Sequence, residues 1–251
     1  GDIYFVTSNG DFDVNTGGLD YGDSIEKLGP SGTVVDYFTP HDEQDLSANN
    51  LDLGAGGPVM LVDQTTGAYP HLLITAGKAG TIYVINRDNM GKYNPNNDGQ
   101  IVQVLPGALP NGTAESGNFS TPVFFNKYVY FGAVNDSIKA FQFTNGLLSA
   151  TPASQTTTLY QARGASFAVS ANGNSNSILW ALQNNGVSAD TDNVGNPGVL
   201  FAYDANNLAT ELYDSSQSGT RDTLDLASKF SIPLVANGKV FIAGQTQLTV
   251  F

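Results

Sequence analysis

Short apolar runs recur along the whole chain, and helical periodicity of apolar residues is nearly absent. The runs are rich in Tyr, Phe, Leu, Val and Ile, and Gly, Asn and Pro bound them. This pattern is typical of buried strands that are separated by tight turns. The most apolar strands are expected at residues 4–7, 72–77, 129–132, 178–181 and 240–244.

A second strand follows each of these, and its position reveals a repeat. The second strands are expected at residues 24–28, 81–85, 137–141, 199–203 and 248–251. When Leu28, Ile85, Phe141, Tyr203 and Val250 are taken as equivalent, the successive spacings are 57, 56, 62 and 47 residues. A period in the mid-fifties with loop insertions indicates a repeat architecture.

Two further strands complete the repeated unit. One precedes the most apolar strand and is expected at residues 57–61, 121–125, 166–169 and 232–235. Asn172-Gly173 and Asn237-Gly238 join two of these to the next strand, and Asn-Gly is a strong hairpin signal. A weaker closing strand is expected at residues 33–38, 100–105, 157–161 and 209–213. Four antiparallel strands at this repeat length indicate a propeller blade.

The sequence therefore predicts an all-β fold, a β-propeller of four-stranded antiparallel blades. About four to five blades form a single propeller domain, or a partial propeller, over residues 1–251. The blades are expected at approximately residues 1–40, 57–106, 120–162, 165–215 and 230–251. Because the repeat begins at a second strand and stops at a third, we expect the C-terminal part of a larger ring. Self-association or a partner chain would then complete that ring. A β-sandwich is the main alternative, but it does not predict this repeat.

The composition narrows the classes of function. The chain has 251 residues, a formal net charge of −13 and a pI near 4.2. A strongly acidic surface repels phosphate groups, which argues against nucleic-acid partners and anionic membrane surfaces. No apolar run is long enough for membrane insertion, and no cysteine is present. Gly, Asn, Ser and Thr supply most polar positions, which suits a turn-rich extracellular or periplasmic protein.

The repeat resembles that of quinoprotein-type propellers, the family with pyrroloquinoline quinone (PQQ) repeats. Residues 202–207 (AYDANN) and 140–146 (AFQFTNG) are similar to the strand-turn segment of that repeat. The resemblance covers essentially the whole chain, although the tryptophan that ends this segment in the family is missing. Overall the chain looks like secreted bacterial propellers of this family, and three of its loops are most similar to PQQ-dependent alcohol dehydrogenases.

Two of these loops point to cofactor-binding residues. Residues 7–10 (TSNG), followed by 20–24 (DYGDS), resemble the segment whose asparagine ligates the calcium beneath PQQ, which points to Asn9. Residues 76–80 (AGKAG) resemble a loop whose Arg or Lys contacts the quinone oxygens, which points to Lys78. The alternative for the second loop is a tight hairpin turn.

The third loop points to a catalytic residue. Residues 39–45 (TPHDEQD) resemble a loop whose last aspartate is the catalytic base, which points to Asp45, with Gln44 where the family usually has Trp. In the chemistry that the resemblance implies, calcium polarises the quinone carbonyl and the lysine stabilises the charge that develops. The aspartate takes the alcohol proton while hydride passes to the quinone.

A separate pattern suggests a second type of metal site. Asp11, Asp13 and Asn15 form a D-x-D-x-N run, whose alternating oxygen ligands can wrap one hard cation such as calcium. The run departs from an EF-hand, since Gly17 falls one position late and Gly22 stands where Glu is required. The two interpretations are a calcium site of another type and a polar insertion loop with Asx turns.

The two histidines match no zinc motif. His41 and His71 lie 30 residues apart, without a second ligand at a spacing that zinc motifs use. We expect His41 to form hydrogen bonds within a loop, and His71 to stand at the start of a strand beside Pro70.

Two functions remain open. The missing repeat tryptophan, and the lack of the cysteines that cover the quinone in the resembled enzymes, favour a non-catalytic binding or structural module. Its ligand would be a small molecule or a glycan. The ordered match of three loops favours instead a PQQ- and calcium-dependent alcohol dehydrogenase when the full ring is present. Asp45 would then be the base, Asn9 a calcium ligand and Lys78 the quinone contact.

Overall fold

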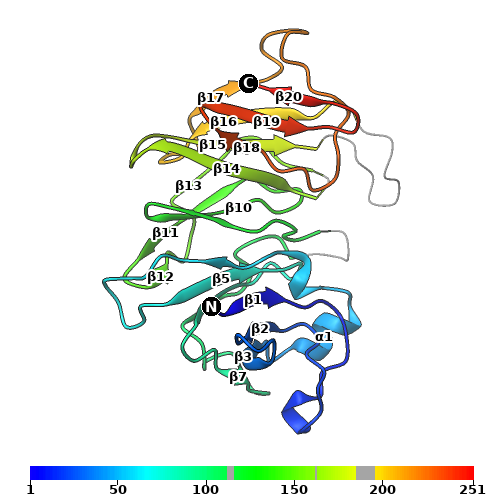
Figure 1. Ribbon diagram of the computed structural model, residues 1–251, viewed down its shortest axis with the longest axis vertical. Coiled ribbons are helices and arrows are strands. Elements are labelled where there is room, and N and C mark those ends of the chain that lie inside the picture. Colours follow the sequence, from blue (N-terminus) through cyan, green and yellow to red (C-terminus); the bar gives the residue numbers. More distant parts are fainter. Residues whose placement is uncertain (112–115, 162, 185–195) are drawn as a thin grey trace. The chain divides into compact units, whose positions relative to one another are not determined.

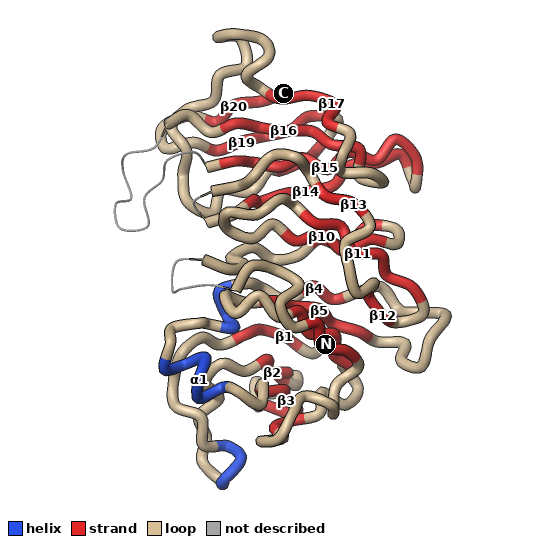
Figure 2. The backbone as a smooth tube through the Cα atoms, turned by 180° about the vertical axis from the view of Figure 1, so that it is seen from behind, coloured by secondary structure: helices blue, strands red, loops and turns tan. Residues whose placement is uncertain are grey.

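The computed structural model describes residues 1–111, 116–161, 163–184 and 196–251. Strands predominate in these residues, and their one α-helix, α1, has six residues (Figure 1). Coloured by secondary structure, the described chain is strand joined by loops almost throughout (Figure 2). No helix within it is long and apolar enough to cross a membrane. The predicted fold class, an all-β protein built from blades of the β-propeller type, is confirmed.

The chain forms two compact units. The first comprises residues 1–122 and 143–150, and the second comprises residues 123–142 and 151–251. The described residues form five sheets, and nearly all strand pairs in them are antiparallel.

The first sheet of the first unit has the order β1-β2-β3-β7. Its strands are β1 (Ile3–Val6), β2 (Ile25–Leu28), β3 (Val34–Thr39) and β7 (Lys92–Tyr93). Three of these strands were expected, whereas β7 was not. It adds to the open edge of β3 in parallel, with Phe38 paired to Lys92.

The second sheet of this unit has the order β4-β5-β6-β8. Its strands are β4 (Val59–Met60), β5 (Leu72–Ala76), β6 (Ile82–Asn86) and β8 (Gln103–Leu105). Every residue of β5 is buried, as expected for a strand covered on both faces. This burial explains why the strand reads as a continuous apolar run rather than an alternating one.

The two sheets of the first unit enclose a common hydrophobic core. One buried residue of β2 and one of β3, Ile25 and Phe38, belong to the same cluster as buried residues of β5 and β6. The buried members of the core are Ile25, Phe38, Leu53, Leu73, Tyr83, Ile85 and Met90. Burial of aromatic and aliphatic surface is the main stabilising contribution here.

Two loop elements of the first unit were not expected from the sequence. Helix α1 (Glu43–Ala48) follows β3, and a short 3₁₀ turn at Leu53–Ala55 leads toward β4. The helix has only one and a half turns and buries Glu43 and Leu46. A periodic apolar pattern cannot appear in so short an element, so sequence reasoning missed it.

The second unit contains the remaining three sheets. The first of them contains β9 (Val123–Phe125), β10 (Tyr128–Phe131), β11 (Lys139–Thr144) and β13 (Ser154–Gln155). The last two residues of β11, and β12 (Leu147–Leu148), which pairs with them, belong to the first unit. The next contains β14 (Ala165–Asn172), β15 (Ser175–Gln183), β16 (Val199–Asp204) and β17 (Glu211–Asp214). The last contains β18 (Leu234–Ala236), β19 (Lys239–Ala243) and β20 (Leu248–Val250).

One predicted closing strand lies elsewhere. We expected it at residues 157–161, whereas β13 pairs with β11 at Ser154–Gln155. Tyr160 forms only an isolated bridge with Asp136. Residues 151–161 are polar and carry no alternating apolar pattern, so the sequence did not fix the register of this strand.

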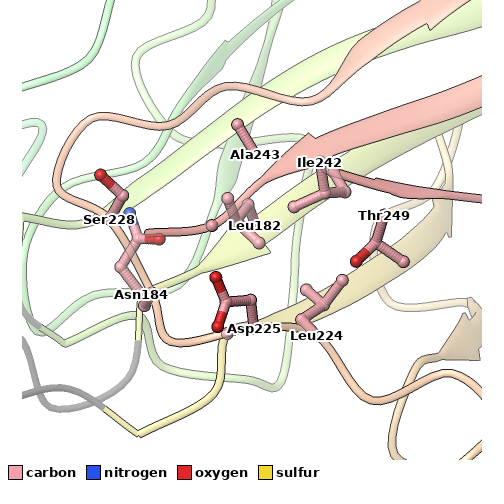
Figure 3. A pocket seen from close by; sticks show the side chains of 11 residues that line it. Leu182, Asn184, Leu224, Asp225, Ser228, Ile242, Ala243 and Thr249 are labelled. Carbon is pink, nitrogen blue, oxygen red and sulfur yellow. The ribbon is translucent and has the colours of Figure 1, made fainter. Parts of the chain in front are cut away.

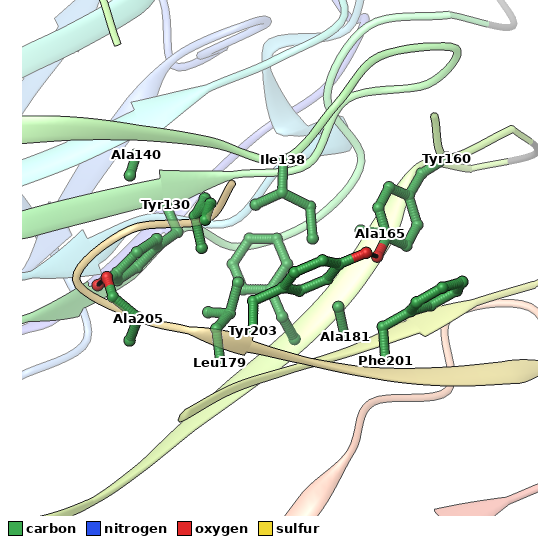
Figure 4. Close-up of a cluster of buried hydrophobic side chains, with 12 residues drawn as sticks. Tyr130, Ile138, Ala140, Tyr160, Ala165, Leu179, Ala181, Phe201, Tyr203 and Ala205 are labelled. Carbon is green, nitrogen blue, oxygen red and sulfur yellow. Dashed lines mark hydrogen bonds between the residues drawn. The ribbon is translucent and has the colours of Figure 1, made fainter. Parts of the chain in front are cut away.

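Aromatic side chains dominate the main core of the second unit (Figure 4). Tyr130 is fully buried and donates its hydroxyl to the carbonyl of Ala205 at 2.7 Å. The hydroxyls of Tyr160 and Tyr203 lie 3.1 Å apart. Buried tyrosine hydroxyls need such partners, and these bonds link β10 to the residue after β16, and Tyr160 to β16.

Candidate functional site

Three loops of the first unit meet around Asn50. Asn9 follows β1, Asn50 and Asp52 follow α1, and Lys78 lies in the turn after β5. The Asn9 side-chain amide donates to Asn50 Oδ1 at 3.0 Å, and its backbone N–H donates to Asp52 Oδ1 at 3.4 Å. Two of the three residues that the resemblance singled out, Asn9 and Lys78, are therefore brought to the same partners.

Lys78 is an internal tie between these loops. Its ammonium forms an ion pair with Asp52 and donates to the backbone oxygen and Oδ1 of Asn50, at 3.2 and 3.3 Å. The residue is 6% exposed, and its ammonium lies 5.7 Å from the centre of the Phe119 ring. Gly77 permits this close approach, because a Cβ there would lie 2.5 Å from the Asp52 carbonyl oxygen.

Asp23 is a buried carboxylate beside this group. Its Oδ1 accepts the backbone N–H of Leu53 at 2.8 Å, and its Oδ2 is buried without a hydrogen-bond partner. Burial raises the pKa of Asp23, and the nearby charges of Asp52 and Asp42 raise it further, whereas Lys78 opposes them. The sequence did not single out Asp23, because its burial results from the packing of distant loops.

Asp45, the predicted base, lies on α1 and is exposed. Its carbonyl accepts the backbone N–H and side-chain amide of Asn49, at 3.1 and 2.8 Å. Its charge contributes to the raised pKa values of His41 and Asp42. These interactions associate Asp45 with Asn49, His41 and Asp42, and its role as a base remains a prediction.

The D-x-D-x-N run folds as a hydrogen-bonded insertion loop after β1. Asp13 Oδ1 accepts the backbone N–H of Asp20 at 2.9 Å, and the carbonyl of Asp11 accepts the N–H of Gly22 at 2.8 Å. A 3₁₀ turn at Val14–Thr16 contains Asn15. These hydrogen bonds are the kind expected of a polar insertion loop. The calcium site at Asp11, Asp13 and Asn15 remains a prediction.

PQQ and calcium are the groups that the resemblance implies at Lys78 and Asn9. A lysine ammonium has three donors, and here they face three protein acceptors on Asn50 and Asp52. No donor is left for a quinone oxygen, so this arrangement does not fit the predicted quinone contact.

In the described part of the chain, the only set of three or more His, Asp and Glu side chains grouped closely enough to share an ion is His41, Asp42 and Asp98.

That group lies in an open cleft of the first unit, with a volume of about 550 Å³. Its lining combines polar residues with apolar ones such as Ile101, Val104 and Pro106. Tyr83 of β6 also lines the cleft and is 2% exposed. Burial and the charges of Asp42 and Asp98 raise the pKa of the Tyr83 hydroxyl, so it remains a neutral donor.

Asp98 positions the histidine at this cleft. Its Oδ1 accepts the backbone N–H of His41 at 2.8 Å, and its Oδ2 lies 2.9 Å from His41 Nδ1. The hydrogen bond to Asp98 raises the pKa of His41, and burial raises that of Asp42. The prediction that His41 forms loop hydrogen bonds is confirmed. Its partner could not be predicted, because the two residues lie 57 positions apart.

The second unit offers less space for a ligand. A pocket lined by Leu182, Asn184, Asp225 and Ile242 has a volume of only about 10 Å³ (Figure 3). That volume holds at most about one water molecule. A hollow of about 410 Å³, smaller than the cleft at His41, lies beside Asn206. The cleft at His41 is therefore the better candidate site.

Comparison with known proteins gives only distant likenesses. No protein-family model and no curated protein matches the chain. The computationally designed Ika4 protein is 13% identical with a TM-score of 0.44, over 72% of this chain and 84% of Ika4. The designed Ika8 protein is 13% identical with a TM-score of 0.46, over 93% of this chain and 57% of Ika8.

The third likeness is to BamB from Moraxella catarrhalis. It is 11% identical with a TM-score of 0.40, over 90% of this chain and 66% of BamB. The chain thus spans less than two thirds of Ika8 and of BamB. All three TM-scores are below 0.5, so these likenesses carry no argument about function.

Proposed function

We propose that this chain is a non-catalytic binding module of the β-propeller type, and that a small molecule binds in the cleft at His41. The observation that carries this proposal is the cleft itself, about 550 Å³ in volume and bordered by both polar and apolar residues. Small-molecule sites in proteins have about 300–1,000 Å³ and a few polar groups that orient the ligand.

The chemistry of the cleft favours a neutral, polyhydroxylated ligand such as a sugar. Asp42, Asp98 and Asn97 are among the polar residues that line it. Carboxylate and amide oxygens accept hydrogen bonds from hydroxyl groups, whereas an anionic ligand would meet like charge. The net charge of −13 disfavours anionic ligands further.

A PQQ- and calcium-dependent alcohol dehydrogenase is the alternative. The observation in its favour is that Asn9 and Lys78 share Asn50 and Asp52 as partners. That enzyme would need the Lys78 ammonium to leave Asp52 before it could meet a quinone oxygen. The present pairing therefore supports the binding module.

Reconstitution of the chain with PQQ and calcium distinguishes the binding module from the alcohol dehydrogenase. We expect no saturable binding of PQQ in equilibrium dialysis with calcium present, and no dye-linked oxidation of alcohols. Stoichiometric PQQ binding together with activity that disappears in Asp45→Asn would overturn the binding-module proposal.

Saturation-transfer NMR with neutral mono- and disaccharides tests the cleft. We expect transfer to at least one sugar in the wild-type chain, and its loss in Val102→Trp, which fills the lining. Leu212→Trp is the matched control, because Leu212 is 52% exposed in the second unit. Transfer that survives in Val102→Trp, or is absent for every sugar, would count against this ligand class.

A further inference from the structure

His41, Asp42 and Asp98 combine three potential metal ligands in one place. One nitrogen or oxygen atom from each lies within 4.8 Å of the others. His41 Nδ1 is 2.9 Å from Asp98 Oδ2 and 4.0 Å from Asp42 Oδ1. The three residues come from the β3–α1 connection and from the loop before β8, so tertiary packing rather than a local motif assembles them.

We propose that His41, Asp42 and Asp98 bind one divalent transition-metal ion, such as Zn²⁺, at the edge of the cleft. One imidazole nitrogen and two carboxylate oxygens are a ligand set that zinc and related ions accept, whereas calcium prefers oxygen alone. This inference goes beyond the binding function, because the protein would hold the ion whether or not an organic ligand enters the cleft.

The distances suit an ion after a small movement of two side chains. Zinc bonds of about 2.0–2.2 Å hold the ligand atoms of a tetrahedral site about 3.3–3.6 Å apart. The observed separations of 2.9 and 4.0 Å lie on either side of this range. Slight separation of the His41–Asp98 pair and approach of Asp42 would bring all three atoms to an ion without a change in the backbone.

The state of the two carboxylates supports the same conclusion. Asp98 has a side chain that is 6% exposed, and its second oxygen bonds the backbone N–H of His41, so it is a rigid ligand. Asp42 Oδ1 is buried and has no hydrogen-bond partner. A buried carboxylate oxygen without a partner is costly, and a bound cation would remove that cost.

The local charge also favours a cation. Two carboxylates, those of Asp42 and Asp98, lie within 4.0 Å of a single imidazole that can carry at most one positive charge, so the group is short of positive charge. Because all three proposed ligands also border the cleft, an ion with only three protein ligands would keep a coordination position open toward it.

His71 provides a matched control within the same unit. Its Nδ1 lies 2.9 Å from Asp88, and its Nε2 lies 3.8 Å from Asp63. The chain thus contains a second histidine with two aspartates, but this set is more exposed and is not grouped closely enough to share an ion. If the ion binds at one geometrically defined site, substitution of His41 should weaken metal binding and substitution of His71 should not. If cations bind non-specifically to the acidic surface, the two substitutions should have the same effect.

The experiment titrates the metal-free chain of 251 residues with Zn²⁺ alone in a calorimeter, and with Co²⁺ in an absorption spectrometer. We expect one site at micromolar or lower Kd, with cobalt d–d bands in the visible that report histidine and carboxylate ligation. His41→Ala and Asp42→Asn should weaken Zn²⁺ binding at least tenfold and abolish the bands. His71→Ala should leave both unchanged.

Asp42→Asn guards against loss of folding, because the oxygen that it replaces has no hydrogen bond to lose. Circular dichroism confirms the fold of each variant before titration. The proposal is overturned if the wild-type chain binds no Zn²⁺ below about 100 μM. It is equally overturned if His41→Ala and His71→Ala weaken binding to the same extent, which would indicate general attraction of cations to the acidic surface.

Discussion

The ammonium of Lys78 pairs with the carboxylate of Asp52, and the protein shields both groups from solvent. The Lys78 side chain is 7% exposed and that of Asp52 is 17% exposed. The pair connects the turn after β5 to the loop after α1, and Asn50 supplies the remaining acceptors. A residue that resembles a cofactor contact therefore acts as a structural link in this chain.

Lys78→Met should destabilise the protein by about 3 kcal/mol. Removing one partner of a shielded ion pair leaves the Asp52 charge without compensation in a poorly solvated place. Urea unfolding followed by circular dichroism measures this loss. Lys92→Met, at an exposed lysine of β7, is the control and should stay within about 0.5 kcal/mol of wild type. Equal effects of both substitutions would show that the Lys78 pair contributes nothing specific.

Tyr130→Phe should destabilise the protein by about 1 kcal/mol. The substitution keeps the buried ring but removes the hydroxyl that donates to the Ala205 carbonyl at 2.7 Å. A buried acceptor without its donor costs about this amount. Chemical denaturation is the measurement, and Tyr69→Phe is the control, because Tyr69 is 42% exposed. A Tyr130→Phe protein as stable as wild type would mean that water replaces the lost donor.

The strands could be predicted from the sequence because their apolar runs and turns are local signals. β5 lies within its expected segment, and β6, β16 and β19 match theirs to within one residue at each end, since burial on one or both faces dictates their composition. β7 could not be predicted. It has two polar residues, Lys92 and Tyr93, and only the open edge of β3 makes it a strand.

The Asn-Gly turns show the limit of a local signal. Asn237-Gly238 forms the expected two-residue turn, with φ values of 51° and 71°, because Ala236 pairs with Lys239. In the other hairpin Asn172 still belongs to the strand and pairs with Ser175, so Gly173 is the first turn residue. The Asn-Gly dipeptide correctly predicts the position of both hairpins, but the strand register determines which residues form the turn.

The candidate site was less predictable than the fold. The sequence pointed to Asn9 and Lys78, and the structure brings them to Asn50 and Asp52, which no motif marked. Asp98 was missed as well, because only tertiary packing places it against a histidine far away in the sequence. Local motifs identify single residues, whereas the partners that determine their chemistry come from other loops.

Gly238→Ala should destabilise the protein by about 1–2 kcal/mol. The φ of Gly238 is +71°, a conformation that costs an L-residue about this much. No heavy atom lies within 4 Å of the added Cβ, so the effect isolates backbone strain from steric contact. Gly10→Ala is the matched control, because its backbone lies outside the left-handed region and its nearest contact is 3.6 Å. Urea unfolding should show no loss for the control, and equal losses would contradict the turn geometry.

Asp23→Asn should change how stability depends on pH. Burial raises the pKa of Asp23 in the folded protein above its ordinary value of 3.8, which the unfolded chain retains. Below that value both states hold the proton, and the raised pKa favours folding. As pH rises from 3.8 through the folded-state pKa, this contribution is lost. The unfolded chain releases the proton of Asp23 at a lower pH than the folded protein does, so rising pH favours the unfolded state. Asparagine has no proton to lose, so the stability of Asp23→Asn relative to wild type should increase across this window.

Urea unfolding at several pH values between 4 and 8 measures the difference in stability between Asp23→Asn and wild type. Asp20→Asn, at an exposed aspartate, is the control for the loss of one negative charge. A difference that is flat with pH, or that falls as pH rises, would mean that Asp23 is ionised and well solvated in the folded protein.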